Sequence, residues 1–587
     1  MNFPSFISTY LGKALSEAGF SSEGLQNQIK PSTDAKFGDY QYNGAMGLAK
    51  ETKSPPRKVA EKIAEKFNMS EVLESVEIAG PGFMNFRIKS QWLAMQMQRM
   101  ATDPRLCVEK PTQAKTYVVD FSSPNVAKPM HVGHLRSTIL GDSLARILRF
   151  LGHTVITDNH LGDWGTQFGI ILYGFKNLLN QEAFNKDPVK ELSRLYVDVR
   201  KLFKNPEDAD KTSEDVVQNA CREETAKLHR GDLVNLELWR KFMPVCLSEI
   251  DQVYKRLDVK FDYSYGESFY QPYLEKIVEE FTAAGLARES EGAMAIFLTE
   301  DSTPALIRKR DGAFTYMTTD LATIKYRVDQ WKPDAILYVV DSRQSLHFSQ
   351  LFQIANKWLG EKTALEHISF GSVLGPDRKP IKTRSGTAVA SLDQLLDEAI
   401  KLANEINDCV DPTVEASNIE IKEDVKEVGT VVGVGAVKYA DLCQNRTSDY
   451  VFNWEKMMAM EGNTAAYMQY AYARNRSIFR KGGFDPNLYR SSSVNVILDS
   501  VEERSLALQL FRFEEAISLS VIDFKPSNIT GYLWDLAKAY SVFFQNCPVL
   551  KASTEEVRQG RLLLCDLTAR VLKQGLELLG IGVIEKM

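Results

Sequence analysis

Two histidines three residues apart open a segment that could hold a phosphate. His131 and His134 flank Gly133, directly before a run of residues typical of a long helix. The unsatisfied backbone N–H groups and the dipole of a helix N-terminus favour an anion at such a position. Imidazole N–H groups placed there could stabilise the negative charge that builds on a phosphate during substitution. The glycine leaves room for a flat base or sugar to lie against the backbone.

The flanking segments distinguish a phosphate site from a pair of surface histidines. An H-x-G-H tetrapeptide alone is short, and two histidines near a turn often have no function. Here the run 116–121 is rich in β-branched residues and predicts a buried parallel strand, and a turn rich in Ser, Pro and Asn follows it. A helix is expected over 131–150 and a second strand over 154–157. This order of elements predicts a doubly wound, Rossmann-like α/β domain with the histidines at its first helix.

The α/β domain is expected to span 116–385 and to contain further strands at 335–340 and 367–370. Between the two pairs of strands, the charged and helix-prone stretch of about 181–258 predicts a helical insertion. Two histidines and an α/β layer in this arrangement form the expected catalytic centre of the chain.

Smaller domains are expected on both sides. Residues 1–105 predict an α+β domain, with a helix at the start, a second helix over 45–67 and a strand–turn–strand unit over 76–86. A connecting helical segment is expected over 386–445. Residues 446–587 predict an all-α bundle, because apolar residues recur there at three- and four-residue spacing.

Composition sets broad limits on the function. The 587 residues are 44% hydrophobic and 25% charged, as in globular proteins, and the net charge of −6 provides no overall basic field for a nucleic acid. Local basic patches could still bind RNA. The seven cysteines include no C-x-x-C pair, so we expect no structural metal and a reducing compartment. No apolar run approaches the roughly 20 residues that span a bilayer, so we expect a cytoplasmic protein without a membrane partner.

Two nucleotide-binding motifs of other protein classes are incomplete. Gly433 and Gly435 suggest a dinucleotide loop, but Lys438 stands where the third glycine is needed, which favours a tightly packed helix. The sequence contains no G-x-x-x-x-G-K-[ST], which excludes a P-loop ATPase.

The segment 122–138, S-S-P-N-V-A-K-P-M-H-V-G-H-L-R-S-T, resembles the nucleotide-binding signature of class I aminoacyl-tRNA synthetases in its arginyl form. The resemblance continues in family order through 158–169, Arg310-Asp311-Gly312, Tyr316 with Asp320, and 461–467. The G-D-Y and G-P-G-F segments near the N-terminus are similar to the extra domain of that family. The likeness therefore covers nearly the whole chain.

The resemblance implies a ligase that activates L-arginine with ATP and Mg²⁺ to arginyl-AMP, then transfers it to the 3′-terminal adenosine of tRNA-Arg. It implies a monomer, and the family often needs bound tRNA for the first step. The implied ATP-binding residues are Lys128, Gly133, His131 and His134, and the two histidines are also the implied catalytic groups. The usual second signature is replaced by a degenerate loop at 375–386, where Lys382 is the expected catalytic lysine and Lys379 assists it.

The resemblance also assigns residues to arginine and to tRNA. A guanidinium requires planar carboxylate partners. The implied arginine-binding residues are Asp120, Asn125, Glu267, Tyr316, Asp320 and Gln344. For tRNA, the resemblance implies Phe83 and Asn85 in the N-terminal domain. The helix near 469–479 interleaves aromatic residues with arginines, and this pattern predicts that Tyr470 and Arg474 contact tRNA. Two alternatives remain open: a class I synthetase for another amino acid, and a non-catalytic RNA-binding relative.

Overall fold

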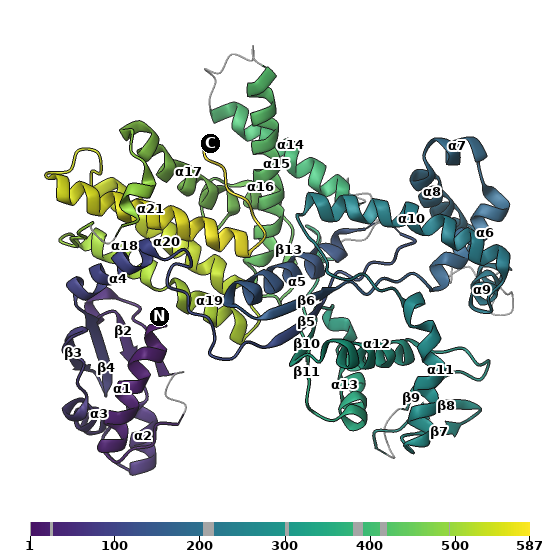
Figure 1. Ribbon diagram of the computed structural model, residues 1–587, viewed down its shortest axis with the longest axis horizontal. Coiled ribbons are helices and arrows are strands. Elements are labelled where there is room, and N and C mark those ends of the chain that lie inside the picture. Colours follow the sequence, from purple (N-terminus) through teal and green to yellow (C-terminus); the bar gives the residue numbers. More distant parts are fainter. Residues whose placement is uncertain are drawn as a thin grey trace. The chain divides into compact units, whose positions relative to one another are not determined.

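The computed structural model forms two compact units (Figure 1). The structure describes residues 2–23, 28–128, 130–203, 216–299, 304–379, 391–410, 419–491 and 494–587, with backbone alone for 406–410 and 419–426. The first unit comprises Met1–Lys110, Ala459–Glu577 and Ile581–Met587. The second unit comprises Pro111–Met458 and Leu578–Gly580.

A four-stranded parallel sheet forms the centre of the second unit. Its strands are β5 (Thr116–Asp120), β6 (Thr154–Asp158), β10 (Ala335–Tyr338) and β11 (Ala364–His367), in the spatial order β11-β10-β5-β6. The chain leaves β5 for β6 on one side and later adds β10 and β11 on the other. The order therefore reverses beside β5, which is where open α/β sheets bind ligands at their carboxyl ends. The doubly wound α/β domain is confirmed.

Helices cover both faces of this sheet. Helix α5 (Val132–Leu151) connects β5 to β6, and Gly152 ends it with a left-handed φ of 105°. The other face packs Val118 and Ile336 against the apolar side chains of three helices. These are α11 (Glu267–Ala283), α12 (Tyr316–Trp331) and α13 (Ser345–Leu359). The predicted strand at 367–370 is displaced: β11 ends at His367, because the segment that pairs with β10 begins at Ala364.

The stretch between α5 and α11 is helical, as predicted. After β6 the chain forms α6 (Thr166–Leu178), α7 (Gln181–Lys186), α8 (Pro188–Lys201), α9 (Val216–His229) and α10 (Leu233–Arg256). A three-stranded antiparallel sheet follows α11, with β7 (Ala287–Ser290), β8 (Ala293–Ile296) and β9 (Ala305–Arg308). The sequence did not predict this sheet, because its strands have only four residues each and show little alternation of apolar and polar residues.

Two helices close the second unit. Helix α14 (Leu392–Val410) packs against α15 (Ile419–Leu442), and both contact α5. The short strands β12 (Val373–Leu374) and β13 (Tyr450–Val451) pair in parallel, and α16 (Trp454–Met458) ends the unit. The G-x-G at 433–435 lies inside α15, in agreement with the packed-helix interpretation. An added Cβ at Gly433 would lie 2.7 Å from the Ala399 carbonyl of α14, so the glycine allows the two helices to approach closely.

The N-terminal part of the first unit is an α+β domain. A four-stranded antiparallel sheet has the order β1-β2-β4-β3, and α1 (Phe3–Glu17), α2, α3 and α4 pack with it. The remaining bounds are β1 Ile29–Pro31, β2 Tyr40–Tyr42, β3 Leu73–Ala79, β4 Phe83–Ile88, α2 Ala45–Thr52, α3 Pro56–Lys66 and α4 Ser90–Thr102. The single helix predicted over 45–67 is wrong. It is interrupted at Lys53, which has a left-handed φ of 50°, and Pro55 and Pro56 lack the N–H groups that would continue it.

The C-terminal part of the first unit is the predicted helical bundle. Its helices are α17 (Ala465–Gly482), α18 (Val501–Phe511), α19 (Phe513–Ile522), α20 (Ser527–Asn546) and α21 (Glu555–Leu578). Helix α18 begins with a capping box in which the Ser500 side chain accepts from the Glu503 N–H and the Glu503 side chain accepts from the Ser500 N–H. Among the described residues, no helix combines the length and apolar character needed to cross a membrane.

A buried ion pair joins the two parts of the first unit. The Arg504 guanidinium on α18 donates to both carboxylate oxygens of Asp39, at 2.9 and 2.7 Å, and also to the Ile88 carbonyl. Asp39 is only 3% exposed and also accepts from the Ile88 N–H. This geometry leaves the Asp39 carboxylate dependent on a single cation.

We expect Arg504→Met to lower the free energy of unfolding by about 3–5 kcal/mol, because the buried Asp39 carboxylate would lose its counter-charge. Urea denaturation of the full chain measures the effect. Arg57→Met is the matched control: the Arg57–Glu61 pair is exposed and should contribute less than about 1 kcal/mol. Equal losses in the two variants would contradict the stabilising role of the Arg504 pair.

Candidate active site

The histidine pair caps the helix that it opens. His131 is the N-cap of α5, and its Nδ1 accepts from the Gly133 N–H at 3.0 Å. His134 Nδ1 accepts from the His131 N–H at 3.1 Å, and the ring centroids are 4.1 Å apart. These contacts correct one expectation, because the N–H groups of His131 and Gly133 are already occupied by the imidazoles. Gly133 is needed for a further reason: an added Cβ would lie 2.7 Å from the His131 ring.

Both imidazoles are held neutral with the proton on Nε2. Burial lowers the pKa of His134 to about 3, with smaller contributions from the charges of His131 and Lys128. Burial also lowers the pKa of His131, and Lys128 and Arg343 add to the effect. Since each Nδ1 accepts a backbone hydrogen bond, a neutral ring must carry its proton on Nε2. The site thus offers two uncharged N–H donors beside a helix N-terminus.

Residues on the turn before α5 surround the histidines. The Asn125 side chain accepts from the Ala127 N–H at 3.2 Å, and its backbone forms a bridge with Gly162. Lys128 is half-buried, and burial together with the charge of Arg200 lowers its pKa. Its Nζ lies 5.5 Å from the centre of the Tyr196 ring on α8. Lys128 therefore lies between the turn and the helical insertion.

A buried arginine occupies the carboxyl end of the sheet. Arg327 on α12 is fully buried, and its Nη2 lies 2.7 Å from Asp120 Oδ2 and 2.8 Å from Asp158 Oδ2. The Ser123 hydroxyl donates to the other oxygen of Asp120 at 3.1 Å. Burial opposes the charge of Arg327, but the two carboxylates raise its pKa well above the usual range. Asp120 thus faces the site with both oxygens already in contact with neighbours.

Further acids lie around the same strand ends. Glu267 is the first residue of α11, and its pKa is raised to about 7. Burial is the main cause, His160 acts in the opposite direction, and the charges of Asp163 and Asp320 add to the increase. Asp163 accepts from both the N–H and the hydroxyl of Ser268, at 2.8 and 2.5 Å. Gly266 is required beside this carboxylate, because an added Cβ would lie 2.3 Å from it.

Helix α12 presents Tyr316 and Asp320 one turn apart. Tyr316 is 67% exposed, and its pKa is raised by burial of its hydroxyl and by the charge of Glu267. Asp320 Oδ2 lies 2.6 Å from His347 Nε2, on α13. Gln344 is exposed at the end of a 3₁₀ turn (Ser342–Gln344) that leads into α13. The structure therefore brings Tyr316, Asp320 and Glu267 close together.

Several buried polar atoms in this region have unused hydrogen-bonding capacity. Within the described ranges, no partner is present for Asp158 Oδ1, His160 Nδ1 or Arg327 Nη1. Buried polar groups normally have a partner, so such a cluster is typical of a ligand site. The sequence-based prediction did not include Arg327, His160 and His347 among the site residues. Only the reversal of strand order beside β5 could have indicated where such residues would gather.

The loop predicted to replace the second signature is only partly described. Lys379 is exposed, and its carbonyl accepts from the Gly375 N–H at 2.8 Å in a turn where Arg378 has a left-handed φ of 56°. Lys382 lies outside the described residues. Buried Arg136 from α5 fixes the base of this loop, because its Nη1 donates to the Gly371 and Ser448 carbonyls at 2.7 and 2.9 Å.

The candidate RNA-binding side chains differ in their exposure. Phe83 is half-buried, whereas Asn85 is 4% exposed and accepts from Gln41 at 2.7 Å. Tyr470 is 38% exposed, and the Arg474 guanidinium lies 3.8 Å from the centre of the Phe544 ring.

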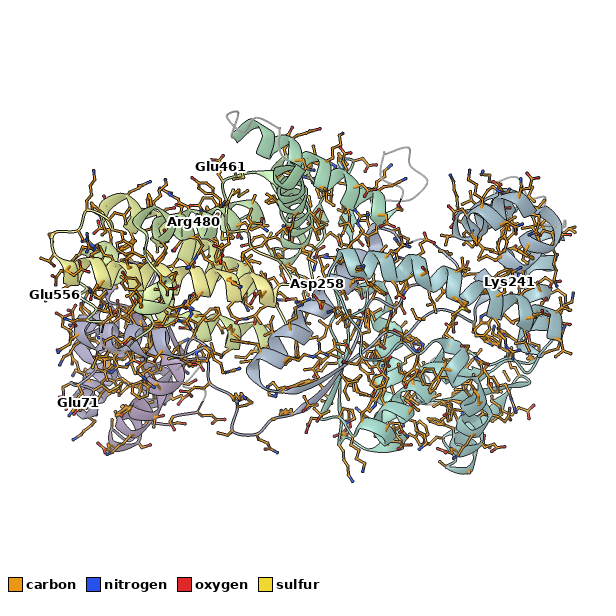
Figure 2. All side chains as sticks on the ribbon, turned by 45° about the horizontal axis from the view of Figure 1, so that its top comes forward. Glu71, Lys241, Asp258, Glu461, Arg480 and Glu556 are labelled. Carbon is orange, nitrogen blue, oxygen red and sulfur yellow. The ribbon has the colours of Figure 1, made fainter. Side chains whose placement is uncertain are left out.

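Two other side chains of the same helix, α17, make contacts inside the first unit. They are Tyr472 and Arg476, which belong to the same interleaved pattern. Tyr472 donates to Glu585 at 2.7 Å, and Arg476 pairs with Asp566 at 3.2 Å. Arg480, labelled in Figure 2, is exposed and donates to the Glu585 carbonyl.

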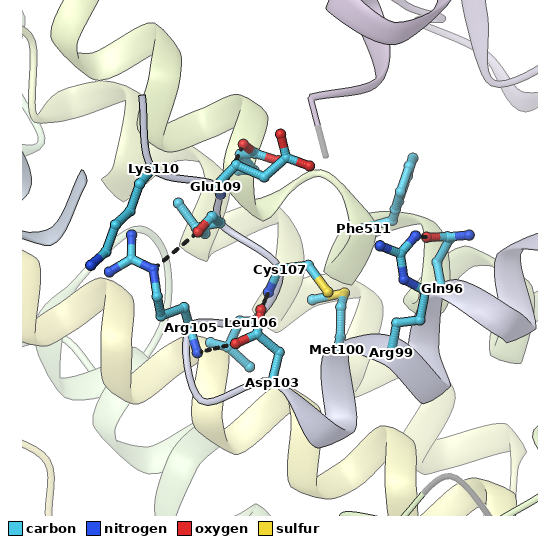
Figure 3. Close-up of a pocket in the computed structure, with 12 residues that line it drawn as sticks. Gln96, Arg99, Met100, Asp103, Arg105, Leu106, Cys107, Glu109, Lys110 and Phe511 are labelled. Carbon is cyan, nitrogen blue, oxygen red and sulfur yellow. Dashed lines mark hydrogen bonds between the residues drawn. The ribbon is translucent and has the colours of Figure 1, made fainter. Parts of the chain in front are cut away.

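A separate cavity of about 280 Å³ lies in the first unit (Figure 3). Its lining includes Arg99, Asp103, Cys107 and Phe511, and none of the predicted site residues. The Asp103 carboxylate accepts from the Cys107 N–H at 2.8 Å, which holds the wall of the cavity in place. In the described part of the chain, no group of three or more His, Cys, Asp or Glu side chains has the arrangement of a metal site.

Comparisons with known proteins agree over the whole chain. Residues 96–454 match the family described as tRNA synthetases class I (R), catalytic domain. Residues 5–88 match the arginyl tRNA synthetase N terminal domain, and residues 468–587 match the DALR anticodon binding domain.

Similar proteins were also found at full length. The arginine–tRNA ligases of Rhodopirellula baltica and Cellvibrio japonicus are each 42% identical, with complete coverage of both chains. Among solved structures, the arginyl-tRNA synthetase of Plasmodium falciparum is 28% identical with a TM-score of 0.83, covering 100% of this chain and 99% of its own. The Thermus thermophilus enzyme is 25% identical with a TM-score of 0.79, covering 99% and 100%.

We expect His134 to remain neutral across the physiological pH range, because its folded-state pKa of about 3 lies below the usual value of 6.5. Nitrogen chemical shifts of ¹⁵N-histidine-labelled protein should show a proton on Nε2 from pH 8 to pH 5. The proton uptake of the unfolded state should lower stability as the pH falls below about 6.5. Titration of the His134 signal near pH 6.5 would contradict this assignment.

Proposed function

We propose, from the premise that the chain belongs to the arginyl-tRNA synthetase family, that arginine is activated at the carboxyl end of the β5–β10 pair. The chain is an arginine–tRNA ligase of class I and uses ATP as a substrate. In the first step the arginine carboxylate attacks the α-phosphate of ATP, and pyrophosphate leaves. The single observation that carries the site assignment is the pair of neutral imidazole donors at the start of α5, the helix that follows the strand ending at Asp120.

ATP would be held by the turn and by the start of α5. The Nε2–H groups of His131 and His134 would donate to phosphate oxygens, and Gly133 leaves its exposed backbone open to the nucleoside. Lys128 supplies a nearby positive charge. Neutral donors suit this role because they stabilise developing charge without needing a proton. Mg²⁺ would arrive with the ATP, and Lys379 and Lys382 of the 375–386 loop would neutralise the leaving pyrophosphate.

Side chains of the pocket would bind both ends of arginine: the guanidinium at one end, and the α-amino and carboxylate groups at the other. Asp320 and Glu267 are the proposed carboxylates for the guanidinium, with Tyr316 packed against its plane. Asp120 and Asn125 are proposed to hold the α-amino and carboxylate groups, and Gln344 to line the pocket. The partly protonated state of Glu267 suits a cationic ligand, because a guanidinium would favour its ionised form. A neutral side chain would leave these carboxylates unpaired, which disfavours other amino acids.

The second step transfers the arginyl group to the 2′-hydroxyl of the terminal adenosine of tRNA-Arg, and AMP leaves. We assign residues 1–105 to a tRNA-contacting domain, 116–385 to catalysis, 386–445 to a connection and 446–587 to anticodon binding. Tyr470 is exposed on α17 and could stack with a base, and Arg474 is proposed to contact the backbone. Phe83 and Asn85 are proposed for a tRNA loop, and Asn85 would have to exchange its bond to Gln41.

We also propose that the enzyme acts as a cytoplasmic monomer, as the family resemblance implies. Sedimentation velocity of the full chain tests the oligomeric state. A concentration-independent species of about 66 kDa is expected from the chain mass.

The specificity is tested by ATP–pyrophosphate exchange with each amino acid, in the presence of tRNA. Exchange with arginine alone is expected. Exchange with lysine or glutamine but not arginine would indicate a synthetase for another amino acid. Binding of tRNA without any exchange would indicate a non-catalytic relative.

His134→Ala should slow adenylate formation by on the order of 10²–10³-fold, because one donor to the developing phosphate charge would be lost. Pre-steady-state measurement of adenylate formation checks this. His153→Ala is the control, since His153 accepts from the Lys115 N–H and lies outside the proposed site. Unchanged adenylate formation in His134→Ala would rule out the assigned role.

Asp320→Asn should raise the KM for arginine far more than the KM for ATP, since a neutral amide cannot pair with the guanidinium. Steady-state exchange kinetics with each substrate varied in turn provide the measurement. Equal changes in both constants would count against the pocket assignment.

A further inference from the structure

The carboxylate of Asp320 is held by a side chain from the next helix. His347 lies in the first turn of α13, and its Nε2 is 2.6 Å from Asp320 Oδ2. The two side chains are 29% and 27% exposed, so they lie at the wall of the site and can meet a ligand. The contact joins α12 to α13 across 27 residues of sequence.

This contact uses only part of the capacity of the carboxylate. An ionised carboxylate has about four lone-pair directions, and the imidazole occupies one of them on Oδ2. Within the described residues no other hydrogen bond reaches the Asp320 carboxylate, so Oδ1 and the second lone pair of Oδ2 can accept the parallel N–H groups of a guanidinium. A carboxylate already fixed in one orientation loses less conformational freedom when it binds.

The protonation state of His347 determines how much charge Asp320 presents. A neutral imidazole donates to the carboxylate and leaves its negative charge in place, whereas an imidazolium neutralises that charge. The hydrogen bond to Asp320 raises the pKa of His347, and burial opposes the increase.

The other groups near this pair come from four elements, including β10, where the charge of Asp320 helps to raise the pKa of Tyr338 after the larger effect of burial. The ring of Phe348 lies 5.5 Å from His347, and His367 of β11 stacks on Phe348 at 4.8 Å. Glu267 of α11 is close enough for the Asp320 charge to raise its pKa. Asp320 is thus the acid that faces His347 directly, and Glu267 is the next titratable acid in the pocket.

We propose that His347 is a positioning residue for arginine recognition, holding Asp320 in the orientation that accepts the guanidinium and favouring arginine when the imidazole is neutral. The inference rests on the proposed assignment of Asp320 to the guanidinium. His347 itself touches the carboxylate and not the reacting atoms.

The first test compares His347→Ala with His347→Gln. The Gln amide nitrogen can reach the place of Nε2 and donate without becoming charged. His347→Ala should raise the KM for arginine about tenfold, the loss expected for a hydrogen bond to a charged group, and change the KM for ATP less than about twofold. His347→Gln should restore the KM for arginine to within about threefold of the wild type. Failure of the Gln variant to restore binding would overturn the proposal.

A double-mutant cycle tests whether His347 acts through Asp320. If it does, His347→Ala should add less than about twofold to the arginine KM of Asp320→Asn. A full multiplication of the two separate effects would show that His347 acts independently of Asp320, and would overturn the proposal. Gln353→Ala is the matched control, because Gln353 lies on the same helix and its amide donates to the carbonyl and the hydroxyl of Ser349.

The pH dependence provides a readout that a purely structural role would not change. As the pH falls, protonation of His347 neutralises Asp320 and protonation of Glu267 removes a second charge, so the arginine KM of the wild type should rise. In His347→Gln only the Glu267 contribution remains, and the rise should be shallower. An equally steep profile in the two proteins would overturn the proposal.

The outcomes separate this inference from the proposed function. Absence of arginine-dependent exchange in the wild type would overturn both. If Asp320→Asn leaves the arginine KM unchanged, the pocket assignment and this inference fail together, while the ligase activity stands. If Asp320→Asn raises the KM and His347→Ala does not, only the role of His347 fails.

Discussion

The site depends on a guanidinium that belongs to the protein itself. Arg327 is fully buried between Asp120 at the end of β5 and Asp158 at the end of β6. Two carboxylates at neighbouring strand ends would repel each other without a cation, and burial would increase the cost. Because Arg327 reaches them from α12, the same helix that supplies the charge also presents Tyr316 and Asp320 to the pocket. The two ion pairs of Arg327 therefore hold the sheet to the helix that lines the proposed pocket.

The proposed arginine pocket combines several acids that have a polar partner or a raised pKa. Asp120 is paired with Arg327, Asp320 contacts His347, and burial gives Glu267 a pKa of about 7. Each acid thus has a partner or a raised pKa in the absence of a ligand, and Asp320 keeps its negative charge for the proposed arginine guanidinium while His347 is neutral. This arrangement explains how a cation-binding site can lie in a partly buried position without destabilising the fold. It would also link the proposed recognition of arginine to the protonation of Glu267 and His347.

The proposed phosphate-binding part of the site differs from the arginine pocket, because its two histidines are neutral donors. There the imidazoles of His131 and His134 are kept neutral by burial and by nearby cations, and they cap the helix that carries them. Arg136, one turn further along α5, ties this helix to the base of the 375–386 loop through the Gly371 carbonyl. A displacement of α5 would therefore also displace the base of the loop that is proposed to cover the pyrophosphate.

The sequence by itself determined the elements whose signals are local. The β-branched run before the histidines, the turn and the long amphipathic helix were enough to predict the parallel α/β layer, and motif order indicated the family. Pro55 and Pro56 are a local signal for the break within 45–67, and the single-helix prediction overlooked it. The start of β11, three residues earlier than expected, could not be predicted from the sequence, because its pairing with β10 sets that limit. Arg327, His160 and His347 carry no local signal, and only the meeting of β5, β6, α12 and α13 gives them a role. The tertiary structure decided which side chains share charge, because electrostatic contacts depend on distance in space and not on spacing along the chain.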